Sequence, residues 1–167
     1  TTSRKLAQDH GFELRFSVGA LMVRVSGKSC GTMARMSEHS PYILAFDTAN
    51  EVIAVGLGVL HPDTRTVECV ASKRIPAHRA SNTRLLPEIE GLLAEAGVSR
   101  TDIVSVACGR GPGSFTGVRI AIATAKGMAS ALEVPLVGVS TLDAIAWQLQ
   151  MAGYRANALI VADAMRH

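Results

Sequence analysis

Apolar residues follow a strand-like pattern from residue 42 onward. Residues 42–46 form an apolar run that ends at Asp47, and a second apolar run covers residues 52–60. Turn-forming residues at 48–50 separate the two runs, which predicts a β-hairpin. After another turn, residues 66–70 alternate between apolar and polar side chains and predict a third strand with one exposed face. The regular part of the chain therefore begins with three strands joined by short turns.

The period of the pattern changes to that of a helix after residue 80. Apolar side chains recur at helical spacing between residues 85 and 96, Ser81 or Asn82 can cap the start, and Gly97 ends the helix. Helices and strands then alternate along the rest of the chain: a strand at 103–108, a helix at 118–132, a strand at 134–138, a helix from 140 to 151 and a strand at 158–162.

This order of elements predicts an α/β fold with one mixed sheet flanked by helices. Residues 41–152 are expected to form the domain. Residues 153–167 are interpreted as the beginning of a truncated second domain, because Asp163-Ala164 repeats the strand ending Asp47-Thr-Ala49. Residues 1–40 form an extension of uncertain status. It is either a real hairpin or the result of a start site upstream of Met36.

Composition excludes several classes of protein. Hydrophobic residues make up 48% of the 167 residues and charged residues 19%, which excludes a disordered chain. Charged residues interrupt every long apolar run, so no membrane span is predicted. The net charge of +3 arises within residues 1–40. The remainder is neutral and is not expected to bind nucleic acid directly.

The cysteine pattern points to a reducing compartment. The chain has three cysteines (Cys30, Cys69 and Cys108) that are far apart and form no CxxC pair. This pattern argues against a disulfide framework or a zinc site, and it favours the cytoplasm. Cys108, at the end of an apolar strand, is expected to be an inert core thiol.

The Gly-rich segment at residues 109–117 is the most informative motif. It lies between a predicted strand and a predicted helix, where free backbone N–H groups favour an anion. It matches neither the Walker A loop nor the GxGxxG pattern. Either the glycines permit close backbone packing while Ser114 or Thr116 caps the helix, or the segment contacts a phosphate. The candidate residues of this segment are Gly111, Gly113, Ser114, Thr116 and Gly117.

Asp47 and Thr48, at the tip of the first hairpin, are the other phosphate-loop candidates. The carboxylate could hold a metal-bound phosphate, or it could accept turn N–H groups in an Asx turn. The histidines lack HxxxH and HExxH spacing, and Ser114 does not lie in a GxSxG elbow. The residues therefore predict neither a metal site nor an assembled catalytic centre.

Five blocks of the sequence resemble the TsaB (YeaZ) family in order and spacing. The most specific is Gly111-Pro-Gly-Ser-Phe-Thr-Gly-Val-Arg-Ile120. The other four are Ile43-Leu-Ala-Phe-Asp-Thr-Ala49, Leu85-Leu-Pro-Glu-Ile89, Ala123-Thr-Ala-Lys-Gly127 and Val137-Gly-Val-Ser-Thr-Leu-Asp143. The resemblance spans about residues 42–163. One departure is Ser81-Asn82, where the family often has His-Ser, and another is the short length of the chain.

The resemblance implies an actin-like ATPase-domain fold and a role in making N6-threonylcarbamoyladenosine at position 37 of tRNA. It implies a non-catalytic subunit that pairs with a TsaD-like transferase and is joined by a TsaE-like ATPase. The subunit would form a homodimer when alone and reach tRNA only through the complex. No cofactor is expected on this chain alone. The resemblance leaves open whether ATP or ADP binds with Mg²⁺ at the partner interface.

The resemblance also implies roles for individual residues. Asp47 and Thr48 match the first phosphate-loop position, and residues 111–117 match the signature loop. The two helices on either side of the 103–108 strand match the pairing surface. Its candidate residues are Leu85, Leu86, Ile89, Arg119 and Ile122. The alternative function is a small ATP-dependent phosphotransferase or ATPase of the same fold.

Overall fold

The computed structural model describes residues 41–64, 66–76, 81–154 and 156–161, together with the backbone of residues 12–17 and 20–25. The strands are β1 (Phe12–Ser17), β2 (Ala20–Val25), β3 (Tyr42–Asp47), β4 (Val52–His61), β5 (Thr66–Pro76), β6 (Ile103–Gly109) and β7 (Leu136–Val139). The helices are α1 (Ser81–Ala96), α2 (Phe115–Leu132) and α3 (Thr141–Met151), with a short 3₁₀ turn at Arg100–Asp102.

The central sheet has the strand order β5-β4-β3-β6-β7. Strands β3, β4 and β5 are antiparallel neighbours, and β3, β6 and β7 run parallel. The predicted mixed α/β sheet is therefore confirmed. Strands β1 and β2 pair with each other as a separate antiparallel hairpin.

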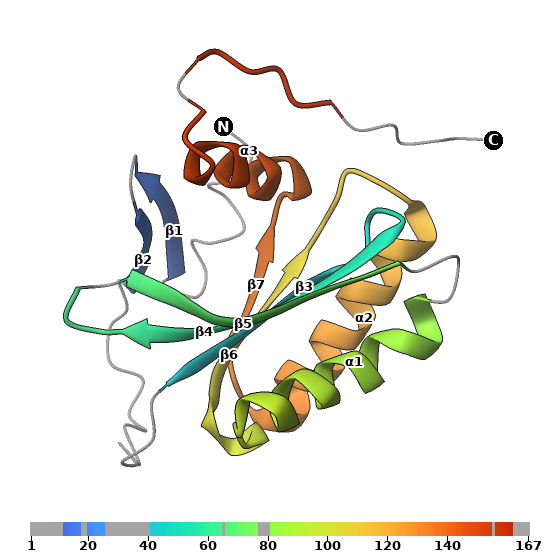
Figure 1. Ribbon diagram of the computed structural model, residues 1–167. Helices are drawn as coiled ribbons and strands as arrows, with labels where there is room; N and C mark the ends of the chain where they lie inside the picture. Colours follow the sequence, from blue (N-terminus) through green and yellow to red (C-terminus); the bar gives the residue numbers. More distant parts are fainter. Residues whose placement is uncertain are drawn as a thin grey trace.

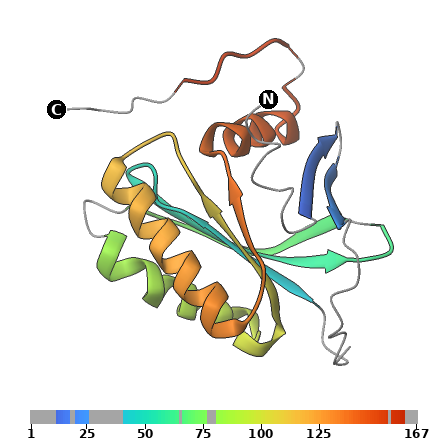
Figure 2. The same cartoon turned by 180° about the vertical axis from the view of Figure 1, so that it is seen from behind.

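The core lies between the sheet and the helices α1 and α2, which run side by side across one face (Figures 1 and 2). Alternate residues of β3 and β4 point into it because successive strand side chains face opposite ways. Leu44 and Ile53 are fully buried there, as are Ala121 and Ala125 of α2. Because alanine side chains are short, the backbone of α2 can approach the sheet closely.

Most predicted boundaries agree with the structure, and α1 ends before Gly97 as expected, with Gly97 in the left-handed conformation (φ 66°). Two differ. Helix α2 begins at Phe115 rather than at residue 118. The strand predicted at 158–162 is wrong for its described residues, since residues 158–161 pair with no strand and Leu159 is 89% exposed. Asp163 and Ala164 lie outside the described residues.

Within the residues that the structure describes, no helix combines the length and the apolar character needed to cross a membrane.

Candidate functional site

Three loops meet at the carboxyl ends of β3, β6 and β7. Because these strands are parallel, their carboxyl ends share one edge of the sheet. Backbone hydrogen bonds join the loops directly: Ser114 N donates to Ala49 O at 2.7 Å, and Thr141 N donates to Gly111 O at 2.9 Å. We call the loop segments 47–49, 109–117 and 140–141 the Gly-rich junction.

Both carboxylate oxygens of Asp47 accept hydrogen bonds from this chain. Oδ1 accepts from the backbone N–H of Ala49 at 2.7 Å, which confirms the Asx-turn interpretation. Oδ2 accepts from the Thr141 hydroxyl at 2.6 Å, across 94 positions of sequence. Asp47 therefore connects the tip of the first hairpin to the first residue of α3.

Close backbone contact between the β3–β4 turn and α2 requires glycine at two positions. A Cβ atom at Gly117 would overlap the carbonyl oxygen of Thr48, and one at Gly113 would overlap the backbone of Ala49. The buried Thr48 hydroxyl also donates to Gly117 O at 2.6 Å. These contacts support the packing interpretation of the Gly-rich segment.

A third glycine, Gly109 at the end of β6, faces Asp47. A Cβ atom there would overlap the carboxyl group of Asp47, so any residue other than glycine would displace the carboxylate. Gly111 lies in the left-handed region (φ 84°), which also favours glycine.

Ser114 caps the amino end of α2. Its hydroxyl accepts a hydrogen bond from Gly117 N at 3.3 Å, and its carbonyl accepts one from Val118 N at 2.9 Å. The sequence left open whether Ser114 or Thr116 caps the helix, and the structure identifies Ser114 as the cap. Thr116 is exposed on the first turn of α2. The structure thus brings the phosphate-loop candidates to one edge of the sheet, whereas a bound phosphate stays a prediction.

The structure corrects the set of interface candidates on α1. Leu85 and Ile89 are each 1% exposed and belong to the core, so their side chains cannot contact a docked partner. Leu86, between them in the sequence, is 50% exposed on the outer face. The predicted interface role of Leu85 and Ile89 is therefore wrong for the side chains, whereas the same role predicted for Leu86 stays a prediction.

The two interface candidates on α2 differ in exposure. Arg119 is exposed, and its guanidinium lies over the ring of Phe115, 4.9 Å from the ring centroid. Ile122 is partly buried against the core. Sequence reasoning missed Phe115, which is 74% exposed. The sequence feature that could have identified Phe115 is a large aromatic residue within a segment whose other residues are small or polar.

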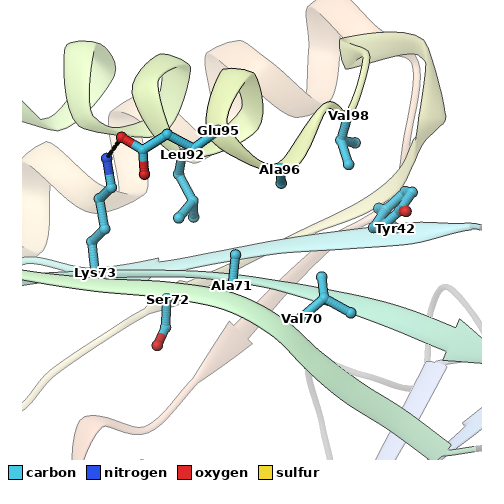
Figure 3. Close-up of a pocket in the computed structure, with 9 residues that line it drawn as sticks. All are labelled: Tyr42, Val70, Ala71, Ser72, Lys73, Leu92, Glu95, Ala96 and Val98. Carbon is cyan, nitrogen blue, oxygen red and sulfur yellow. Dashed lines mark hydrogen bonds and ion pairs between the residues drawn. The ribbon is translucent and has the colours of Figure 1, made fainter.

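A separate cavity of about 340 Å³ lies between β5 and α1, away from the Gly-rich junction (Figure 3). Leu92 and Val98 give it an apolar wall, and the ion pair between Lys73 and Glu95 spans one end. The two charged side chains of its lining therefore neutralise each other. Across the described residues, no cluster of three or more His, Cys, Asp or Glu could hold a metal ion.

Burial raises the pKa of the Cys108 thiol to about 11, against an ordinary value of 9.0. The Asp47 carboxylate raises this pKa further, and Lys126 acts in the opposite direction. Cys108 is only 4% exposed, so its predicted position in the core is confirmed, and its inertness stays a prediction.

We expect iodoacetamide at pH 8 to alkylate the exposed Cys69 in the native protein and to leave Cys108 unmodified, because the thiolate is the reactive form. Peptide mass spectrometry would measure both sites in one sample. The folded state keeps the Cys108 proton to a higher pH than the unfolded chain. Its contribution to stability is therefore complete below pH 9 and is lost between pH 9 and pH 11. Equal native-state alkylation of the two cysteines would contradict the buried position of Cys108.

Comparisons with known proteins show that the chain is similar to proteins of tRNA modification. A family model described as "TsaD: tRNA N6-adenosine threonylcarbamoyltransferase" matches residues 74–167. The tRNA threonylcarbamoyladenosine biosynthesis protein TsaB of Escherichia coli is 45% identical over 105 residues, which cover 60% of this chain and 40% of that protein. TsaB of Bacillus subtilis is 33% identical over 104 residues, covering 62% of this chain and 43% of that protein.

The structure of YeaZ from Pseudomonas aeruginosa matches with a TM-score of 0.58 and 38% identity, over 67% of this chain and 49% of that chain. The actin-like fold class predicted from the sequence is thereby confirmed. The chain spans less than half the length of each of these three relatives. The matched family model covers more than half of the chain, and the relatives agree with it. The chain therefore belongs to the TsaB (YeaZ) family.

Proposed function

We propose that the chain is a subunit without catalytic activity of its own in tRNA threonylcarbamoyladenosine modification, and that it pairs with a TsaD-type transferase. The names of its relatives support the pathway. One observation supports the absence of catalytic activity: the polar groups of the motif form hydrogen bonds with other groups of the same chain. Asp47, Thr48 and Ser114 all engage in hydrogen bonds within the Gly-rich junction.

An actin-like fold implies a nucleotide with Mg²⁺ at this edge of the sheet, and the residues present do not fit that group as they stand. Each Asp47 oxygen already accepts one hydrogen bond within the chain, and the Ser114 amide donates to Ala49 O. The close approach of Gly117 to Thr48 O also fills the space between hairpin and helix. ATP or ADP at a partner interface would therefore take its ligands from the partner.

The surface proposed for pairing is the outer face of α1 and the first turns of α2. Leu86 and Phe115 are large, apolar and at least half exposed there. Arg119 stacks on Phe115 and adds a cation beside the apolar side chains. An aromatic and an arginine beside an apolar residue are typical of residues that dominate binding energy at interfaces.

The proposal extends to the other members of the assembly. The same helix face would form a homodimer when the chain is alone, because one apolar surface can serve two partners in turn. A TsaE-type ATPase would join the pair. The neutral charge of residues 41–167 supports contact with tRNA only through the complex.

Replacing Leu86 by aspartate is expected to weaken binding to a TsaD-type transferase of the same organism by roughly tenfold or more, because a charge would be buried at the interface. The fold should survive, with the free energy of unfolding changed by about 0.5 kcal/mol, since Leu86 is half exposed. Isothermal titration calorimetry with the purified partner measures the affinity.

Leu159→Asp is the matched control, because Leu159 is 89% exposed and lies on the segment after α3. It should bind the transferase as the unmodified chain does. Binding unaffected by Leu86→Asp, or lost equally with Leu159→Asp, would contradict pairing through α1 and α2.

A further inference from the structure

The register of the β1–β2 hairpin divides its residues between two faces of different composition. Successive residues of a strand belong to opposite faces, and residues paired across the strands belong to the same face. Leu14 pairs with Val23, and Arg15 pairs with Met22. The face that holds Leu14 consists only of large apolar residues, namely Phe12, Leu14, Phe16, Leu21, Val23 and Val25. The opposite face includes the charged residues Glu13, Arg15 and Arg24.

A hairpin of this composition needs a surface to cover its apolar face. Two antiparallel strands alone are at best marginally stable in water, and they gain stability by packing against another element. Among the described strands, β1 and β2 pair only with each other. Stability for the hairpin must therefore come from contact through its face rather than from a longer hydrogen-bonded sheet.

The central sheet offers an apolar surface on the side away from α1 and α2. Leu44 and Leu57 belong to the core on the helix side, so the residues between them in each strand belong to the other side. Figure 3 shows this alternation on β5, where Ser72 points away from α1. The apolar residues and glycine on this side of β3, β4 and β5 are all partly exposed, and we call them the open sheet face: Ile43, Ala45, Ala54, Gly56, Leu60 and Val67.

The shape and position of the open sheet face fit the hairpin. Ala45, Ala54 and Gly56 at its centre are small, which leaves room for larger side chains from a second layer. Of the described helices, only α1 packs extensively against β4 and β5, and it does so from the core side. Strand β2 lies beside β5. Both views place the hairpin on the side of β4 and β5 away from α1 and α2 (Figures 1 and 2).

We propose that the β1–β2 hairpin packs its apolar face on the open sheet face as a second β layer, so that residues 12–25 are part of the folded domain. The occupant is the hairpin of the same chain rather than of a second copy. Strand β2 already lies beside β5, and the covalent connection gives the hairpin an effective concentration on the order of millimolar at this face. Leu86 and Phe115 take no part in this contact, so it is independent of pairing with a transferase.

Two neighbouring residues of β2 provide a matched test on the hairpin. Val23→Asp places a charge on the apolar face, whereas Met22→Asp places the same charge on the opposite face. We expect Val23→Asp to release the hairpin and to accelerate amide hydrogen exchange in residues 12–25 at least tenfold, because a buried charge is costly and an undocked hairpin is marginal. Met22→Asp should leave this exchange slow, and exchange in α1 should be unchanged in both variants.

Two residues of β5 provide the same test from the sheet. Val67 belongs to the open sheet face, whereas Val70 lines the cavity beside α1 with Leu92 and Val98. Val67→Asp should accelerate exchange in residues 12–25 as Val23→Asp does, although it changes no residue of the hairpin. Val70→Asp should leave that exchange slow. Circular dichroism of each variant checks that the central sheet and its helices stay folded.

The same measurements can overturn the docked hairpin. Fast exchange of residues 12–25 in the unmodified chain would show that the hairpin is not docked. Equal effects of Met22→Asp and Val23→Asp, or slow exchange retained in Val67→Asp, would show that the apolar hairpin face does not meet the open sheet face. Protection that falls on dilution, together with a dimer that light scattering detects and Val23→Asp abolishes, would assign the hairpin to a second copy instead.

Discussion

Gly117→Ala is expected to lower the free energy of unfolding by about 3 kcal/mol or more, a large share of what a domain of this size has. The added Cβ atom would overlap the carbonyl oxygen of Thr48, which is backbone and cannot rotate away. Relief requires moving either the β3–β4 turn or the first turn of α2. Such a movement strains the buried hydrogen bond from the Thr48 hydroxyl to Gly117 O. Urea unfolding followed by circular dichroism measures the loss.

Gly127→Ala on the same helix is the matched control. A Cβ atom there meets nothing within 4 Å, and the position is exposed. Alanine should therefore raise the free energy of unfolding by about 0.5–1 kcal/mol, because glycine is a poor helix former. A Gly117→Ala variant as stable as Gly127→Ala would mean that the turn and α2 do not meet as described.

Leu85→Ala is expected to cost about 2–5 kcal/mol, the range for a leucine removed from a packed core. Leu85 is 1% exposed and packs between α1 and the sheet. The lost contacts leave a cavity that α1 cannot close, because Ile89 and Leu92 hold the next turns in place.

The adjacent Leu86→Ala should change stability by only about 0.5 kcal/mol, since that side chain is half exposed. The two variants differ by one position on one helix, so helix propensity cancels in the comparison. Thermal and urea unfolding of both variants measures the difference. Equal losses of stability would show that the two faces of α1 are not divided between core and surface.

The secondary structure of the central domain was largely predictable because its signals are local. The apolar runs of β3 and β4 and the helical spacing on α1 appear directly in the sequence. The start of α2 was misplaced because Gly117 was taken for the end of a loop. It is instead a helical residue whose missing side chain permits contact with Thr48.

The side of α1 that we propose to meet a partner could not be predicted from periodicity alone. The spacing of Leu85 and Ile89 identifies the most apolar face of the helix, and in a single domain that face turns toward the core. The outer face is marked only by one exposed leucine, Leu86. A surface for a partner is recognised only when the core face has been assigned.

The remaining features could not be predicted because they depend on contacts between segments that are distant in the sequence. The Asx turn at Asp47 involves neighbouring residues and was foreseen, whereas its bond to Thr141 depends on how β3 and β7 are arranged. The strand predicted at 158–162 failed for a related reason. A strand needs a hydrogen-bonded neighbour, and the described part of the structure offers none to residues 158–161.

Calorimetric titration of the isolated chain with Mg-ATP, combined with an assay of phosphate release, tests most directly whether the chain has chemistry of its own. We expect no tight binding and no turnover, because the Asp47 carboxylate and the Ser114 backbone N–H already make hydrogen bonds within the Gly-rich junction. Tight binding with turnover that Asp47→Asn abolishes would contradict this expectation and establish the chain as an enzyme.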